Sequence, residues 1–282
     1  ILANGHVLIE GVPGVAKTLL ARLTARLIDA DFSRVQFTPD LMPSDVLGTT
    51  VFNMKTNGFD FHQGPIFADI VLVDEINRAP AKTQAALFEV MEERQISIDG
   101  TTHRMGDLYT ILATQNPVEQ EGTYKLPEAQ LDRFLMKITM DYPSLEEEVN
   151  ILERHHTNAA LVKLDDIVPA ITKEELLSLR AFMNQVFVDR TLLQYIALIV
   201  QQTRTSKAVY LGASPRASVA MLQSSKAYAL LQGRDFVTPE DIKFVAPYVL
   251  QHRLILTAEA EMEGYSPVKV TQRLIDKVEV PK

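Results

Sequence analysis

The chain has 282 residues, of which 46% are hydrophobic and 23% are charged, and it carries a net charge of −8. This composition is typical of a folded globular protein and excludes disordered, collagen-like and coiled-coil chains, while the length favours two unequal domains. The sequence has no cysteine, which excludes disulfides and thiol chemistry and favours a reducing compartment. No apolar run approaches the roughly 18 residues of a membrane span, and no signal peptide is visible. We therefore expect a cytoplasmic protein without membrane insertion.

The charge is unevenly distributed along the chain. Residues 1–145 contain 12 Lys and Arg against 19 Asp and Glu, whereas the remainder contains 16 against 17. A protein that grips nucleic acid by its phosphates needs a basic face. The acidic first half therefore argues against a nucleic-acid partner.

In the first half, short β-branched or apolar runs alternate with helical spacing, which is typical of an α/β domain with a largely parallel sheet. Strands are predicted at His6 to Glu10, Arg34 to Phe37, Ile70 to Val73, Tyr109 to Ala113 and Met136 to Thr139. Helices are predicted at Thr18 to Asp29 and Pro80 to Glu93. Asn57-Gly58 and Asp99-Gly100 predict two inserted hairpins, at residues 50–62 and 95–105, because both dipeptides accept positive φ.

After Pro143 the strand signals stop and helix N-cap signals recur. Side-chain acceptors that can cap a helix stand at Ser144, Thr172, Ser214, Thr238 and Ser266. The sequence thus predicts an α/β domain over residues 1–143, followed by a smaller all-helical domain over residues 144–282.

The first strand leads into a nearly complete phosphate-binding loop, whose backbone N–H groups and following helix would hold phosphates. Its residues, with the next helical position, are Gly11, Val12, Pro13, Gly14, Val15, Ala16, Lys17, Thr18 and Leu19. Lys17 would contact the β and γ phosphates, and the Thr18 hydroxyl would bind Mg²⁺. Ala16 replaces the usual glycine, so we expect this position to keep a negative φ. A glycine-rich turn with a surface lysine is the simpler alternative.

Two carboxylates, Asp74 and Glu75, follow the buried strand Ile70 to Val73. Ligands of open α/β sheets gather at such strand ends. Asp74 would hold Mg²⁺, and Glu75 would orient and deprotonate the attacking water. Acid pairs at strand ends are often merely solvated, but the phosphate loop earlier in the chain favours a nucleotide site.

Several longer segments make the chain similar to the MoxR family of AAA+ ATPases, which are P-loop NTPases with a parallel sheet and a helical lid. They are residues 11–18, 37–45, 74–84, 113–124 and 212–217, in the family's order. The family often has alanine where Ala16 stands. The resemblance implies that the protein binds ATP with Mg²⁺, hydrolyses ATP and assembles into a homo-oligomer, a hexameric ring.

The resemblance also assigns roles to three further residues. Asn116 matches the sensor 1 position between the γ-phosphate and the water, and Arg133 matches an arginine finger that reaches a neighbouring subunit's nucleotide. Arg216 matches sensor 2, in the first turn of a helix capped by Ser214. A turn-capping asparagine, a surface ion pair for Arg133 and a lid-surface arginine are the structural alternatives.

Family members are chaperone-like and remodel client complexes, often with a von Willebrand factor A domain protein, so the resemblance implies such partners. A metal-chelatase subunit, a DNA-remodelling motor and a scaffold without turnover remain open. The inserted hairpins face a pore or partner in this clade, where Phe52, Phe59 and Phe61 could contact a partner. Aromatic pairs across a hairpin more often stabilise the hairpin itself, and we favour that interpretation. The chain begins without a methionine at Ile1, so we expect part of the adenine pocket to precede it.

Overall fold

The computed structural model describes residues 1–116, 123–157 and 164–281, and divides them into two compact units. The α/β unit comprises Leu8–Lys125 and Ile138–Leu176. The lid unit comprises Ile1–Val7, Leu126–Lys137 and Leu177–Lys282. The division into an α/β domain over residues 1–143 and a helical domain over residues 144–282 stays a prediction.

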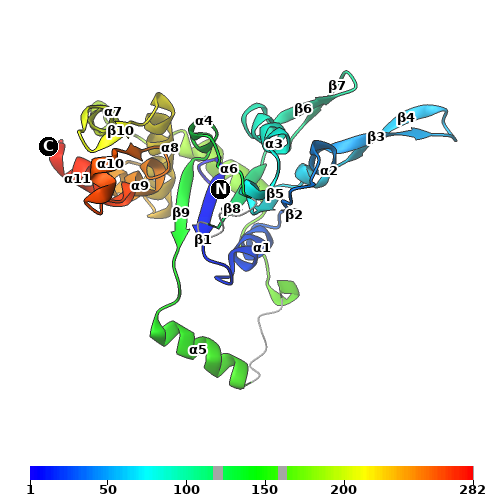
Figure 1. Ribbon diagram of the computed structural model, residues 1–282, viewed down its shortest axis with the longest axis horizontal. Helices are drawn as coiled ribbons and strands as arrows, with labels where there is room; N and C mark the ends of the chain where they lie inside the picture. The colour runs from blue at the N-terminus through cyan, green and yellow to red at the C-terminus, as the bar shows by residue number, and fades with distance from the viewer. Residues whose placement is uncertain (117–122, 158–163, 282) are drawn as a thin grey trace. The chain divides into compact units, whose positions relative to one another are not determined.

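A five-stranded parallel sheet in the order β2-β5-β8-β1-β9 organises the α/β unit (Figure 1). Its strands are β1 (Val7–Gly11), β2 (Phe32–Gln36), β5 (Ile70–Asp74), β8 (Thr110–Gln115) and β9 (Met136–Met140). All five predicted strands are confirmed, with ends displaced by one or two residues.

Strand β5 lies inside the sheet, where both faces of a strand are covered. Ile70, Val71, Leu72 and Val73 are fully buried, which explains their uninterrupted apolar run. β5 pairs in parallel with β2 on one side and with β8 on the other. The helices of this part are α1 (Lys17–Leu27), α2 (Pro43–Leu47) and α3 (Ala81–Glu93), with 3₁₀ turns at Pro65–Phe67 and Ile76–Arg78. The two longer helices were predicted, and α2 was not.

Both predicted hairpins are present. One joins β3 (Gly48–Asn53) to β4 (Gly58–Gln63), and the other joins β6 (Gln95–Ile98) to β7 (Thr101–Arg104). Asn57, Asp99 and Gly100 adopt φ values of 52°, 50° and 80°, as the turns require.

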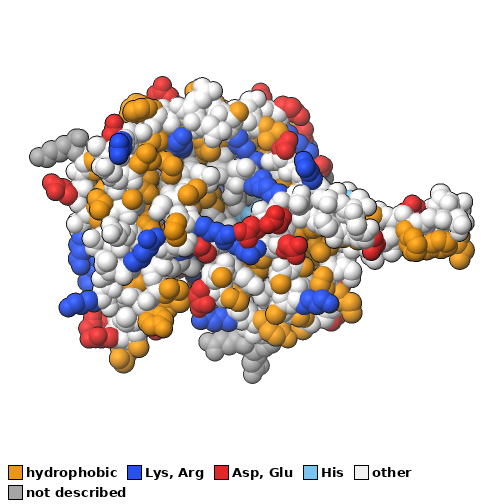
Figure 2. Space-filling model, turned by 90° about the horizontal axis from the view of Figure 1, so that it is seen from above, with side chains coloured by type: hydrophobic (Ala, Val, Ile, Leu, Met, Phe, Trp, Pro, Cys, Tyr) orange, Lys and Arg blue, Asp and Glu red, His pale blue; other side chains and the backbone are white. Residues whose placement is uncertain are grey.

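The β3–β4 hairpin extends from the unit, with hydrophobic side chains gathered along its outer part (Figure 2). Phe52 and Phe59 are paired across the strands and their rings meet edge to face at 5.3 Å. Phe61 packs against His103 of β7, with 4.2 Å between the ring centroids and 33° between the ring planes. These contacts agree with the interpretation that the aromatic residues stabilise the hairpins.

The chain after Pro143 is mainly helical. Its helices are α5 (Leu145–His156), α6 (Lys173–Met183), α7 (Arg190–Thr205), α8 (Pro215–Leu231), α9 (Pro239–Leu250), α10 (Ala258–Met262) and α11 (Pro267–Lys277), with a 3₁₀ turn at Leu164–Asp166. The five predicted caps are all confirmed by side-chain oxygens that accept hydrogen bonds from backbone N–H groups, at Ser144, Thr172, Ser214, Thr238 and Ser266.

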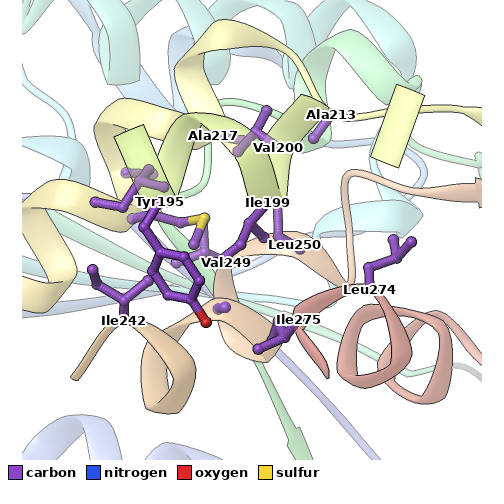
Figure 3. Close-up of a cluster of buried hydrophobic side chains, with 14 of the residues drawn as sticks. Tyr195, Ile199, Val200, Ala213, Ala217, Ile242, Val249, Leu250, Leu274 and Ile275 are labelled. Carbon is purple, nitrogen blue, oxygen red and sulfur yellow. The ribbon is translucent and has the colours of Figure 1, made fainter. Parts of the chain in front are cut away.

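The core of the lid unit is formed by α7, α8, α9 and α11 (Figure 3). Tyr195 and Ile199 of α7, Ile242 and Val249 of α9 and Ile275 of α11 are buried in one cluster. The unit also contains the short helix α4 (Glu128–Leu131). The second domain was predicted to be all helical, but β10 (Val209–Leu211) and β11 (Ile255–Leu256) form a small antiparallel pair in it. Within the described ranges, no helix is long and apolar enough to cross a membrane.

Candidate nucleotide-binding site

Residues 12–16 connect β1 directly to α1, which places the predicted phosphate loop between a strand and a helix N-terminus. Gly11 lies against β9, since a Cβ there would meet the Met140 carbonyl oxygen at 2.7 Å. Gly14 has a φ of 86°, a conformation that favours glycine. Lys17 donates from Nζ to the Gly11 carbonyl at 2.7 Å, so its side chain folds back over the loop.

The expected negative φ at Ala16 is wrong. Ala16 adopts φ 57° and ψ 26°, the left-handed region, and acts as the N-terminal cap residue of α1. The chain turns between the loop and the helix at this residue. The backbone angles of that turn outweigh the preference of alanine for a negative φ. The methyl group is tolerated because the residue is exposed.

The N-terminus of α1 suits a bound anion. No side chain caps it, and its first turn contains no acidic residue. Its backbone N–H groups and the positive end of the helix dipole therefore lack a protein carboxylate to neutralise them. Thr18 and Leu19 belong to this first turn, with Leu19 45% exposed.

The predicted carboxylates lie at the end of β5. Asp74 is 6% exposed, and its Oδ1 accepts a hydrogen bond from the Thr114 hydroxyl at 3.1 Å. The Thr114 oxygen also accepts from the Glu75 backbone N–H at 3.0 Å. Glu75 has a left-handed backbone, with φ 56° and ψ 51°. Thr114 on β8 thus fixes both acids from the neighbouring strand.

Three polar residues contact the same acids without having been predicted to do so. Arg34 Nε lies 2.6 Å from Asp74 Oδ2, and Gln36 Nε2 donates to Glu75 Oε2 at 2.7 Å. Arg78 Nε lies 3.1 Å from that Glu75 oxygen. The available signal was the alternation of β2, which places Arg34 and Gln36 on one face of the sheet, but only the strand order reveals that β2 lies beside β5.

Asn116 follows β8 directly and is buried, with 4% of its surface exposed. Because the strands are parallel, the ends of β2, β5, β8 and β1 meet at one edge of the sheet. The fold therefore brings the phosphate loop, Asn116 and the Asp74–Glu75 pair to the same edge.

These residues fit a magnesium nucleotide. Carboxylate and hydroxyl oxygens are the protein ligands that Mg²⁺ prefers, and Asp74 and Thr18 supply them. The uncapped helix and Lys17 supply the donors that phosphates require. No cluster of three or more His, Asp or Glu side chains with metal-binding geometry occurs in the part of the chain that the structure describes.

Arg133 and Arg216 belong to the lid unit, so they are described apart from the sheet edge. Arg216 occupies the first turn of α8 after Ser214 and Pro215, as predicted, and it is exposed. Arg133 is half-buried. The carboxylate of its neighbour Asp132 binds Arg253 at 2.7 Å and the Ser214 hydroxyl at 2.7 Å. The segment that carries Arg133 is thereby fastened to the start of α8.

Two family models match the chain. Residues 6–136 match the ATPase family associated with various cellular activities, and residues 201–276 match the AAA lid domain. The first match covers β1, β2, β5 and β8 with the site edge and ends at the start of β9, and the second covers α8, α9, α10 and nearly all of α11.

Individual relatives extend the similarity over the entire chain. The chain is 48% identical to the uncharacterized protein YeaC of Bacillus subtilis, covering 100% of this chain and 87% of that protein. It is 44% identical to chaperone MoxR1 of Mycobacterium tuberculosis, covering 100% of this chain and 76% of that protein. A crystal structure of a candidate ATPase from Cytophaga hutchinsonii superimposes with a TM-score of 0.90 at 42% identity, covering 100% and 87% of the two chains. The chain belongs to the MoxR family of AAA+ ATPases.

Proposed function

We propose that the protein hydrolyses ATP with Mg²⁺ and uses the energy to remodel partner protein complexes in the cytoplasm. The observation that carries the proposal is the shared sheet edge, where an uncapped helix, a lysine, two carboxylates and a buried asparagine meet. Similarity to a relative named a chaperone supports the second part of the proposal.

Each residue has a defined task in this reaction. Lys17 and the N–H groups of α1 bind the β and γ phosphates, while Thr18 and Asp74 hold the metal ion. Bound Mg²⁺ would supply charge neutralisation at the phosphates. Glu75 accepts a proton from the attacking water, and Asn116 orients that water.

The remaining tasks require the lid and a second copy of the chain. Arg216 senses the γ-phosphate from the lid of the same subunit, and Arg133 neutralises transition-state charge at the nucleotide of a neighbour. A hexameric ring supplies such neighbours, and loss of the γ-phosphate would move the lid and the hairpins against a client. A von Willebrand factor A domain protein is the proposed adaptor.

The Glu75→Gln variant tests the proposal. Removing the base lowers phosphate release by roughly 10²-fold or more, while the binding of a fluorescent ATP analogue stays within about twofold. Lys17→Ala is the matched variant, for which binding itself is lost. Equal, near-zero phosphate release by the wild type and Glu75→Gln as assembled oligomers contradicts turnover and favours a scaffold.

The same variant, held in its ATP state, identifies the type of client. Affinity capture with Glu75→Gln is expected to enrich a protein complex that Lys17→Ala does not enrich. Copurification of a large chelatase subunit favours the metal-chelatase alternative, and salt-dependent retention on DNA favours the DNA motor. The net charge of −7 over residues 1–145 argues against the latter.

A further inference from the structure

Helix α5 carries a row of aliphatic side chains that the rest of the chain leaves exposed. Leu145, Val149 and Leu152 recur at the spacing of one helix face, and 81%, 45% and 66% of their surfaces are exposed. We name these three residues the α5 stripe. Every residue of α5 whose side chain the structure describes is exposed. Isolated helices shorter than about 12–15 residues are marginal in water, so we expect a partner to cover the stripe of this 12-residue helix.

A second row of exposed aliphatic side chains lies on α1. Leu20, Leu23 and Leu27 share one helix face, and we name them the α1 stripe. Leu20 and Leu27 are 42% and 41% exposed, and Leu23 is half-buried. Ala21 and Ala25, on the opposite face, are buried. The α1 stripe therefore lies on the solvent side of the helix.

The charges beside the two stripes have opposite signs. α1 contains three basic and no acidic residues, and Arg22 and Arg26 lie along one side of its stripe. α5 contains four glutamates and one arginine. Glu146 and Glu153 lie along one side of the α5 stripe, and Glu148 lies along the other. Apolar rows with oppositely charged borders allow two amphipathic helices to select each other, so the two stripes are complementary.

Both stripes stay exposed within one subunit, although the segment after α5 is already attached to α1. The Ala170 and Ile171 backbone N–H groups donate to the Leu27 carbonyl at 2.8 Å and 3.2 Å. Arg26 Nε donates to the Ile167 carbonyl at 3.0 Å. Both helices belong to the α/β unit, and this attachment leaves their apolar faces open. A neighbouring copy of the chain is the occupant that fits them.

We propose that the α5 stripe of one subunit packs on the α1 stripe of a neighbouring copy. The inference rests on the proposed function, which requires neighbours in a ring. Because the two surfaces differ, the contact is heterologous, and each copy offers α5 to one neighbour and receives α5 from another. Since α1 begins with Lys17 and Thr18, the neighbour's α5 would lie on the helix that holds the phosphates.

The first test uses cross-linking, which is specific here because the chain has no cysteine of its own. Leu23→Cys and Val149→Cys each place one thiol at the centre of a stripe. The two proteins are mixed with Mg²⁺ and a non-hydrolysable ATP analogue and treated with a short bismaleimide. A two-chain product is expected to form roughly tenfold faster in the mixture than in either variant alone, because the contact raises the local thiol concentration.

Asn150→Cys is the matched control, because Asn150 is an exposed residue of α5 outside the stripe. Equal rates for Asn150→Cys and Val149→Cys, each mixed with Leu23→Cys, overturn the inference. Rapid cross-linking of Val149→Cys alone also overturns it, because α5 would then pair with a second α5. If a double variant with both Leu23→Cys and Val149→Cys gives mainly a single-chain product, α5 closes on its own α1 and the inference is likewise overturned.

The second test reverses the charges. Replacing Glu146, Glu148 and Glu153 together by Arg changes both sides of the α5 stripe, so the result does not depend on the direction in which the helices pack. The protein concentration at half-assembly, measured by light scattering, is expected to rise roughly tenfold. Adding Arg22→Glu to the same chain is expected to recover roughly threefold of that loss, because one repulsive contact becomes attractive.

This recovery separates a lost contact from a damaged helix, because a change on α1 cannot repair the folding of α5. Arg104→Glu is the matched control, since Arg104 is an exposed arginine on β7. Combined with the α5 replacements, it is expected to recover nothing. Equal recovery by Arg22→Glu and Arg104→Glu overturns the inference.

Failure of the inference is distinct from failure of the proposed function. If the wild type assembles and releases phosphate but the mixture shows no selective cross-link, the inference alone is overturned. Selective cross-linking in a protein that releases no phosphate supports the contact and contradicts only the ATPase. A wild type that stays monomeric with nucleotide, releases no phosphate and gives no selective cross-link overturns both.

Discussion

Two residues of the candidate site, Ala16 and Glu75, adopt left-handed backbone angles, with φ values of 57° and 56°. This conformation places Cβ close to a carbonyl oxygen and costs roughly 1–2 kcal/mol in a residue other than glycine. Ala16 directly precedes Lys17, the proposed phosphate ligand, and Glu75 is itself the proposed base. Backbone strain of this kind is maintained by the surrounding structure and is concentrated at functional sites.

Ala16→Gly is expected to stabilise the nucleotide-free protein by about 1 kcal/mol, because glycine adopts the observed φ without the steric cost. Urea unfolding without nucleotide measures the change. Ala85→Gly, at an exposed position inside α3, is the control and should destabilise by about 1 kcal/mol. Equal destabilisation by both substitutions would mean that Ala16 is not strained.

At the scale of elements, the residues that follow α9 fasten the segment that carries Arg133. Gln251 donates to the Lys137 carbonyl at 2.6 Å, and His252 Nε2 lies 3.1 Å from the Phe134 carbonyl. Arg253 donates to the Asp132 carboxylate and to backbone carbonyls of the same segment. Since these acceptors are mostly backbone oxygens, the attachment depends on the path of the segment more than on its side chains.

His252 makes this attachment sensitive to pH. Burial lowers its pKa from 6.5 to about 3, with smaller contributions from the charges of Arg253 and Lys137. The folded protein therefore keeps His252 neutral, whereas the unfolded chain binds a proton below about pH 6.5. The stabilising contribution is complete above pH 6.5 and is lost progressively as the pH falls toward 3.

The expected slope is up to about 1.4 kcal/mol of unfolding free energy per pH unit below pH 6.5. His252→Gln retains an amide donor for the Phe134 carbonyl but cannot titrate, so its slope between pH 6.5 and pH 5 should be shallower. Urea unfolding across this range measures it. His62→Gln, on the exposed face of the β3–β4 hairpin, should keep the wild-type slope. An identical slope in all three proteins would contradict the assignment to His252.

The sequence predicted best those elements whose signal lies within the element itself or next to it. Long apolar runs located β5 and β8, the Asp99-Gly100 dipeptide located a hairpin turn, and N-cap residues located the starts of helices. β10 and β11 have three and two residues, too few for an alternating pattern to be recognised.

The acids and the loop could be predicted as candidates because each follows a recognisable strand, and Asn116 because the family resemblance adds to its place after a strand. Arg34 and Gln36 escaped prediction because their importance depends on which strand lies next to β2, and strand order is not encoded in local periodicity. The positive φ of Ala16 was not predicted because the turn into α1 outweighs the preference of a single alanine for a negative φ.

At the scale of the whole molecule, the proposed ring would make the single chain only part of a working unit. A heterologous interface that repeats around a closed ring gives every subunit one neighbour that donates to its site and one that receives. Arg133 is the residue proposed to be donated. The defects of Arg133 and Glu75 variants should therefore be separable between subunits.

Mixing Arg133→Ala with Glu75→Gln tests this directly. Each variant alone is inactive, but a mixed ring contains sites in which an intact Glu75 meets an intact Arg133 from the neighbour. Random assembly from equal amounts yields such a site about a quarter of the time, so phosphate release should recover to about a quarter of the wild-type rate. Mixing Lys17→Ala with Glu75→Gln should give no recovery, because both defects lie in the receiving half of the site and no neighbour can correct them. Recovery in neither mixture, with exchange of subunits verified by a fluorescent label, would place the action of Arg133 within its own subunit.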